Sequence, residues 1–215
     1  SATEAMSFWS RDAQNVDGTL SASILQLKHL IMLLFKNKII QRAIEKLPAE
    51  SSKSRQVRIK RIQAKEFLDS GVCDQQGKIT IFGQLYTQCT QDETLVKCFN
   101  LNGVDDQIFG CLFSGEHADD HGGPFRDMLT SMAAEILSPA LPLMVRTANN
   151  RNEIGSDRNC WTINCGSTTP THEELFRFLG YFLGFSMRTK SPLDLDFPPL
   201  FWKKILDEPT SIEDL

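Results

Sequence analysis

The sequence lacks any uninterrupted apolar run of the roughly 20 residues that a membrane-spanning helix requires. Charged or polar residues break its longest apolar stretches at Lys28, His29, Lys36 and Arg177. With a net charge of -4, the chain has no overall positive field that would draw it to nucleic acid or to anionic lipid. The composition therefore predicts neither a membrane span nor a nucleic-acid partner.

The sequence also lacks a CxxC pair, an internal repeat, a low-complexity tract and a recognisable signal peptide. Its six cysteines are therefore expected to stay reduced in a cytoplasmic protein, with no cofactor and no metal site. The 41% apolar fraction is that of an ordinary globular protein. We expect two parts, an N-terminal helical extension over residues 1–52 and a larger domain over residues 53–215.

The N-terminal part is dominated by one amphipathic pattern. Apolar residues keep helical spacing from residue 24 to residue 47, which predicts a long helix that Pro48 ends. The polar stretch 36–38 leaves open a break into two helices. After a polar connector, basic and apolar residues alternate over 55–65, which predicts a strand with one exposed face leading into a helix. A phosphate-binding patch is the alternative, although no aromatic residues lie between these charges.

Three further segments are expected in the middle of the chain. "DQQGK" predicts a turn, with Gly77 available for a positive φ. Residues 79–91 fit a strand or a helix equally well. Residues 108–113 read as a buried strand or a compact turn of the core. Together with the helices, these pieces predict an α+β fold that is predominantly helical.

The stretch "GEHADDHGGPFRDMLTSMAAEIL", residues 115–137, allows three explanations. A zinc site would use His117 and His121, but zinc needs more nitrogen or sulfur ligands than this stretch offers. A phosphate loop would need Lys and Ser or Thr, whereas acidic residues stand here. A tight glycine turn followed by a buried helix fits best, because Pro124 suits a first helical turn. In this explanation Gly123 adopts a positive φ, and Arg126 pairs with a carboxylate.

The stretch "THEELFRFLGYFLGFSM", residues 171–187, predicts a second buried helix. Thr171 and Glu174 fit a capping box at its start. Gly180 and Gly184, four residues apart, are expected to form a groove that another backbone can approach. The following "PLFWKKIL" predicts a short helix with Phe201, Trp202 and Ile205 directed inward and its lysines outward.

Both stretches resemble the HECT ubiquitin ligases, in the same order along the chain, and this resemblance implies that the two segments pack against each other. The "VRIKRIQAKEFLDS" stretch also resembles the start of that domain, so the likeness covers roughly residues 54–215, and "FGQLY" leans toward the HERC subfamily. In the first motif the matching residues are Phe113, Gly115, Glu116, Asp120, Gly122, Gly123, Arg126 and Asp127. In the second they are Phe178, Gly180, Gly184, Leu193, Asp194, Leu195, Pro199, Phe201 and Trp202.

This resemblance implies an activity as well as a fold. HECT ligases accept ubiquitin from an E2 conjugating enzyme onto a C-lobe cysteine and pass it to a lysine of a protein substrate. The chain would be the first part of the N-lobe, without the E2-docking subdomain and without the catalytic C-lobe. It would therefore hold scaffold residues and no catalytic residue, and its open seam could support a dimer. The alternative is a stand-alone helical interaction module without catalysis.

Two departures qualify the resemblance. "KCFN" around Cys98 looks like the active-site sequence of the family, but Lys97 replaces its threonine and the segment precedes the glycine pair. We therefore expect Cys98 to be structural. Some members of the family hold a second ubiquitin with paired aromatic residues that follow the helix after the glycine pair. At these positions the chain has Ala140 and Leu141 instead. Because aromatic anchors supply much of such binding energy, that surface is in doubt here.

Overall fold

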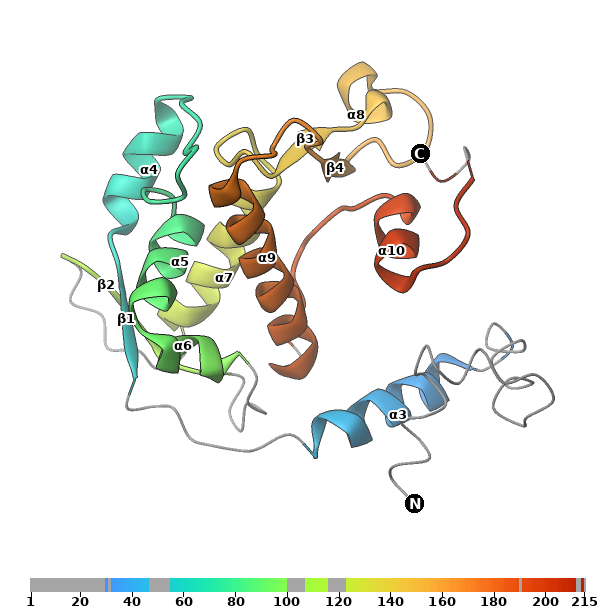
Figure 1. The fold of residues 1–215 in the computed structure, drawn as a ribbon, viewed down its shortest axis with the longest axis horizontal. Coiled ribbons are helices and arrows are strands. Elements are labelled where there is room, and N and C mark those ends of the chain that lie inside the picture. The colour runs from blue at the N-terminus through green and yellow to red at the C-terminus, as the bar shows by residue number, and fades with distance from the viewer. Residues whose placement is uncertain are drawn as a thin grey trace. The chain divides into compact units, whose positions relative to one another are not determined.

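The computed structural model describes residues 30, 32–46, 55–99, 107–115, 123–189, 191–211 and 214 (Figure 1). The chain divides into two compact units, Ser1–Ala49 and Glu50–Leu215, which are treated separately below. The assignment of residues 1–52 as a helical extension and of residues 53–215 as a partial HECT N-lobe stays a prediction. Among the described residues, no helix combines the length and the apolar character needed to cross a bilayer.

The first unit contains helix α3, Leu33–Ile44. The prediction of a helix through Met32 is wrong. The backbone of Met32 is extended, with a ψ of 140°, and this residue stands just before α3. Residues 31–35 are all apolar, so the pattern alone could not fix the first helical residue. The helix runs without a break through residues 36–38. It ends at Ile44, before the proline that was expected to stop it.

The second unit opens with strand β1, Gln56–Ile59, and helix α4, Arg61–Asp69. Val57 and Ile59 are fully buried while the residues between them are exposed, which confirms the predicted strand with one exposed face. β1 pairs in parallel with β2, Gly110–Phe113, and Val57 lies opposite Cys111. The buried strand expected within residues 108–113 is therefore confirmed.

The described part of the segment between these parallel strands contains helices. Helix α5, Ile81–Gln91, and helix α6, Glu93–Cys98, lie between them in sequence. The ambiguous stretch 79–91 thus forms a helix, and Gly77 in the turn before it has a φ of +60° as predicted. A second, antiparallel pair joins β3, Met144–Arg146, to β4, Trp161–Ile163, with helix α8, Ala148–Asn152, between them.

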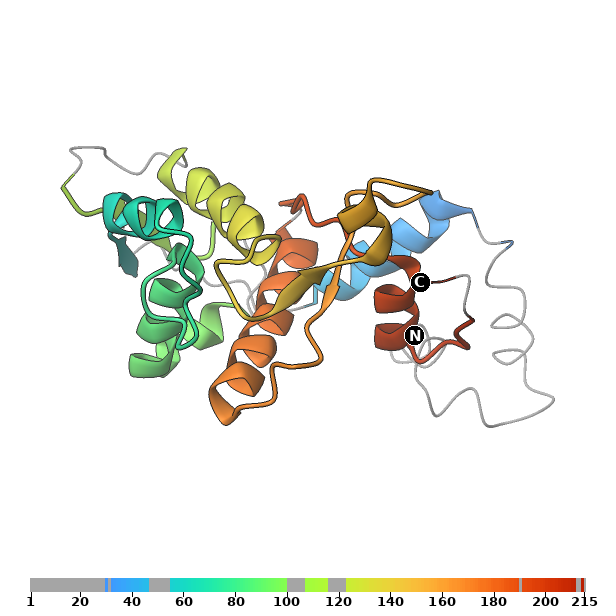
Figure 2. The same ribbon diagram turned by 90° about the horizontal axis from the view of Figure 1, so that it is seen from above.

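Helices α5, α7 (Gly123–Ile136) and α9 (Pro170–Thr189) form the centre of this unit (Figures 1 and 2). Their facing side chains belong to one buried apolar cluster that also takes in β1 and β2. The buried face of α7 contains Phe125, Met128, Leu129, Met132 and Ile136, as its spacing predicted. An α+β fold, predominantly helical with two small strand pairs, is therefore confirmed.

Helix α10, Pro199–Leu206, departs from its predicted packing. Phe201 is buried, but Trp202 is 44% exposed and Ile205 is 52% exposed, so their predicted inward direction is wrong. Helical spacing identifies the apolar face correctly but does not show whether anything covers it. Beyond α10, the ammonium of Lys203 lies 2.6 Å from a carboxylate oxygen of Asp214 and holds the end of the chain against the helix.

Candidate functional site

The two motif helices, α7 and α9, meet through aromatic side chains. The ring of Phe125 on α7 stands edge-on to Phe185 on α9, with centroids 6.0 Å apart. On the other side, Phe82 of α5 contacts Phe178 of α9 with centroids 5.1 Å apart. Phe99 lies between them, 5.7 Å from Phe178 and 5.8 Å from Phe185. The expected mutual burial of the two motif segments is thus observed.

Edge-to-face geometry makes this cluster specific as well as apolar. Such pairs contribute about 0.5–1.5 kcal/mol each beyond the burial of their area. The guanidinium of Arg188, near the end of α9, also donates to the carbonyl oxygen of Phe99. The cluster therefore fixes α9 against α5, α7 and the segment that follows α6.

Two glycines of the first motif are described, Gly115 and Gly123, and the one with a positive φ is not the one predicted. Gly115, just after β2, has a φ of +89°, a conformation in which glycine is favoured. Gly123 is the first residue of α7, has no positive φ, and would leave a Cβ free of contacts within 4 Å. The tight-turn role predicted for Gly123 is therefore wrong. Glu116, Asp120 and Gly122, like His117 and His121, lie outside the described residues.

The Arg-Asp pair at the start of α7 is exposed. A carboxylate oxygen of Asp127 lies 3.6 Å from the guanidinium of Arg61 on α4, and that guanidinium also lies 4.3 Å above the ring of Phe113. An ion pair this exposed contributes little stability on its own. Arg126 is exposed and has no carboxylate partner among the residues that the structure describes. The expected carboxylate partner of Arg126 is thus not seen.

The helix of the second motif begins two residues earlier than predicted. The hydroxyl of Thr169 accepts from the backbone N–H of His172 at 3.2 Å, so Thr169 caps α9. The predicted capping box of Thr171 and Glu174 is wrong, because both residues lie inside the helix. Glu174 pairs instead with Arg177, one turn further along.

Among the residues that the structure describes, no backbone approaches Gly180 or Gly184. Gly180 is exposed and a Cβ there would meet nothing within 4 Å. A Cβ at Gly184 would meet only the side chain of Arg188, at 3.5 Å. The prediction of a groove at these glycines is therefore wrong. Both glycines lie on the side of α9 that faces away from Phe178, Phe182 and the core.

The Leu-Asp-Leu stretch after α9 fastens that helix to the second strand pair. Leu193 and Leu195 pack partly buried against the core, whereas Asp194 between them is exposed. The next residue, Asp196, accepts with its carbonyl oxygen from the backbone N–H of Trp161 in β4 at 2.9 Å. The alternation of two inward leucines with an outward acid explains the residue types of this motif.

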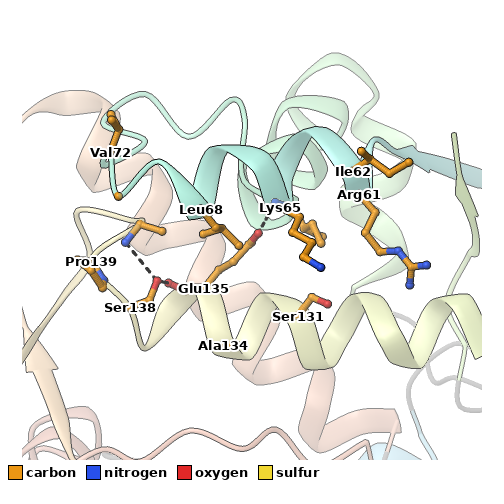
Figure 3. Close-up of a pocket in the computed structure, with 13 residues that line it drawn as sticks. Arg61, Ile62, Lys65, Leu68, Val72, Ser131, Ala134, Glu135, Ser138 and Pro139 are labelled. Carbon is orange, nitrogen blue, oxygen red and sulfur yellow. Dashed lines mark hydrogen bonds between the residues drawn. The ribbon is translucent and has the colours of Figure 1, made fainter. Parts of the chain in front are cut away.

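The buried carboxylate of Glu135, which the sequence analysis did not predict, connects α7 to α5 (Figure 3). Glu135 is 2% exposed, and its two carboxylate oxygens accept from the backbone N–H groups of Ile81 and Phe82, each at 2.8 Å. Burial raises the pKa of Glu135 to about 7, although these two hydrogen bonds act in the opposite direction. Glu135 lies three residues after Met132, so helical spacing places both side chains on the buried face of α7. This spacing was the sequence signal that Glu135 is buried.

A second buried carboxylate shapes the turn before α5. Asp74 is 4% exposed and accepts from the backbone N–H groups of Lys78, Ile79 and Thr80 at 2.7–3.0 Å. The hydroxyl of Thr80 then caps α5 by accepting from Gly83. Together, Asp74 and Glu135 supply acceptors to the unpaired amides at the start of α5.

The cysteines do not form a nucleophilic centre. Cys98 is fully buried, receives a hydrogen bond from the guanidinium of Arg55 at 3.0 Å, and donates to a carbonyl oxygen of its own helix. Burial raises the pKa of Cys89 to about 12 and also raises the pKa values of Cys73 and Cys160. The described part of the chain contains no group of three or more side chains suited to a metal ion.

The stretch after α7 is turned inward where some HECT ligases present aromatic residues. Ala140 is 6% exposed and Leu141 is 1% exposed, so both belong to the interior. The carbonyl oxygen of Ala140 accepts from the backbone N–H of Asp74 at 2.7 Å. These two residues are therefore used in packing and offer no aromatic anchor to a partner.

Comparison with known proteins agrees with this geometry. Residues 130–215, which include the second half of α7 and all of α9 and α10, match the family model described as the HECT-domain (ubiquitin-transferase). Over 162 residues, 74% of this chain, the sequence is 31% identical to the E3 ubiquitin-protein ligase HERC2 of Mus musculus and 30% identical to that of Homo sapiens. It is also 25% identical over 103 residues to the E3 ubiquitin-protein ligase TOM1 of Saccharomyces cerevisiae.

The chain spans about 3% of the length of each of these relatives. The similarity to HERC2 nevertheless covers about three quarters of this chain. Family model, relatives and packing thus point the same way, and the chain belongs to the HECT-domain (ubiquitin-transferase) family.

Proposed function

We propose that this chain is a scaffold part of the N-lobe of a HECT-type E3 ubiquitin-protein ligase of the HERC subfamily. In the complete ligase, a cysteine thiolate of a C-lobe outside this chain attacks the thioester carbonyl that joins ubiquitin to the E2, and the E2 thiol leaves. A lysine amine of the protein substrate then displaces the ligase cysteine and takes the ubiquitin. The chain's own residues hold the framework on which these partners meet.

The observation that carries the proposal is the packing of α7 against α9 around Phe125, Phe178 and Phe185. Segments that carry the two motifs, about 50 residues apart in sequence, form one core that overlaps residues 130–215, the part that matches the HECT-domain model. Four of the six thiols, including Cys89 and Cys98, are buried away from any ubiquitin thioester, whereas Cys165 is exposed and Cys73 is half-buried. We further propose that the complete protein acts in the cytoplasm and without a cofactor.

The alternative, a self-sufficient interaction module, expects no open apolar seam near the end of the chain. Helix α10 instead exposes Trp202, Ile205 and Leu206, the last by 63%. This exposure supports the scaffold proposal, because further parts of a larger domain would cover such a face. It also leaves room for the proposed dimer through the same seam.

A thioester assay tests the proposal. The 215-residue chain and a longer ligase protein that contains it together with a C-terminal Thr-Cys-Phe segment are each incubated with E1, E2, ATP and ubiquitin. Non-reducing gels should show a thiol-sensitive ubiquitin adduct on the longer protein and none on the chain alone. An adduct on a cysteine within these 215 residues would show that the scaffold assignment is wrong.

A further inference from the structure

A groove runs between α4 and α7 on the surface of the second unit (Figure 3). Its volume is about 750 Å³. Along α4, the residues that line it are Arg61, Ile62, Lys65 and Leu68, which share one face of that helix over two turns. The groove therefore follows the helix axis and is longer than a site for a single side chain.

Small side chains on α7 are the reason that the groove exists. Ser131 and Ala134 of α7, and Ser138 just beyond its end, line the groove, so this side offers little volume toward α4. Two closely packed helices would have their axes about 8–10 Å apart and would leave no such space. The residue types on α7 thus keep a channel open that larger side chains would fill.

Both walls of the groove are fixed to α5 by hydrogen bonds. On the α4 side, the backbone N–H of Lys60 donates to the side-chain oxygen of Gln84 in α5 at 2.7 Å. On the α7 side, Glu135 holds the first two amides of α5, and the Ser138 hydroxyl donates to the carbonyl oxygen of Glu135 at 2.7 Å. Because the walls are already in place, a ligand would bind without a large cost of reorganisation.

The groove combines exposed apolar side chains with positive charge. Ile62 is 57% exposed and Val72, at its other end, is 55% exposed, which leaves branched apolar side chains in water beside an open channel. The Lys65 ammonium has no carboxylate partner among the described residues, and Arg61 stands one turn before it. Of the nearby acids, Glu135 is occupied with backbone amides and Asp127 meets Arg61 at 3.6 Å.

We propose that this groove binds an acidic amphipathic helix of a partner protein. Two roughly parallel helices form a seat for a third, as in other complexes in which a helix lies in a groove. The partner's aliphatic side chains, spaced i, i+3 and i+7, pack on Ile62, Leu68 and Val72. Its carboxylates lie along the Lys65 side, where charge complementarity sets the direction of binding. This site does not depend on the proposed ubiquitin transfer.

Fluorescence anisotropy with designed peptides tests the site. The probe is a labelled 16-residue helical peptide with leucines spaced i, i+3 and i+7 and glutamates elsewhere, titrated with the 215-residue chain. A matched peptide carries lysine at every glutamate position. We expect the acidic peptide to bind at least about tenfold more tightly than the basic one, and more weakly as salt increases.

Substitutions locate the binding on the chain. Lys65→Glu reverses the charge of the groove, and Ala134→Phe fills it from α7; each should weaken the acidic peptide about tenfold or more. The matched control is Lys97→Glu, an exposed lysine of α6 that does not line the groove, and it should change the affinity less than about twofold. Melting curves of all three variants show whether each remains folded.

A benzophenone group on the peptide gives an independent readout that does not require a variant. Cross-links should map by mass spectrometry to residues 61–72 or 131–140. Equal affinity for the acidic and basic peptides, no binding at millimolar concentration, cross-links confined to other segments, or full affinity in folded Lys65→Glu and Ala134→Phe variants would each overturn the proposal.

Discussion

Helices α9 and α10 have comparably apolar sequences, but they bury very different fractions of their side chains. Along α9, Phe178, Phe182 and Phe185 are each less than 5% exposed, and Phe178 and Phe185 contact rings from other helices. In α10 only Phe201 is buried, while Trp202 and Ile205 remain about half exposed. The comparison shows that an apolar helix face is a requirement for packing, but the partner elements decide whether the face is covered.

The largest effect should come from truncating Phe182, a ring on the buried face of α9. Phe182 is fully buried, so Phe182→Ala removes its transfer energy and leaves a cavity. We expect a loss of about 3–5 kcal/mol in the free energy of unfolding. Urea denaturation followed by circular dichroism measures it. If the loss were below about 1 kcal/mol, the buried face of α9 could not be closely packed.

The buried carboxylate of Glu135 gives the next largest effect, one that depends on pH. Its pKa is raised from 4.5 to about 7 in the folded state, so between these values the native protein binds more protons than the unfolded chain. The free energy of unfolding should therefore fall as pH rises from 4.5 through 7, by roughly 2–3 kcal/mol. Denaturation curves at several pH values measure this fall.

Glu135→Gln is the control for that titration, because the amide does not ionise in this range. The variant loses one acceptor for the amides at the start of α5, so it should be less stable at low pH. Its stability should nevertheless vary less with pH than that of the wild type. Parallel pH profiles for the two proteins would show that another group is responsible for the titration.

Two glycine substitutions compare a backbone position that a side chain covers, Gly77, with one that faces open space, Gly123. Gly77 has a φ of +60°, and a Cβ there would lie 2.5 Å from a methyl carbon of Leu175 on α9. Gly77→Ala should therefore cost about 1–3 kcal/mol. Gly123→Ala adds a Cβ in open space at the start of α7 and should be neutral or stabilising by up to about 1 kcal/mol. Thermal melts of both variants check the ranking, which the opposite order would contradict.

Local patterns predicted those elements in which every residue lies on a consistent face. Alternation identified β1, and helical spacing identified the buried face of α7, because both elements lie directly against the core. The start of α5 could not be obtained this way, since its sequence suits a strand equally well. Its conformation depends on amide acceptors from Asp74, Thr80 and Glu135, and Glu135 is more than 50 residues away in sequence.

The candidate site was likewise only partly readable from the sequence. The two motifs and their joint burial could be predicted, because matching residue types occur in a fixed order. The groove between α4 and α7 could not, since Ser131, Ala134 and Ser138 are unremarkable until the structure shows that they face Lys65 across a gap. Side-chain volume missing from an interface leaves no pattern in the sequence of a single helix.

The smallest expected effect completes the comparison between α9 and α10. Trp202 is 44% exposed and contacts Phe201 with ring centroids 5.1 Å apart. Trp202→Ala should lower the free energy of unfolding by only about 1–2 kcal/mol, because nearly half of the side-chain surface already faces water. The same denaturation experiment as for Phe182→Ala measures it. A loss as large as that of Phe182→Ala would mean that α10 is covered in solution, by a second copy of the chain or by a closer contact with its own unit. Sedimentation of the wild type at several concentrations would separate these two explanations, since only the first depends on concentration.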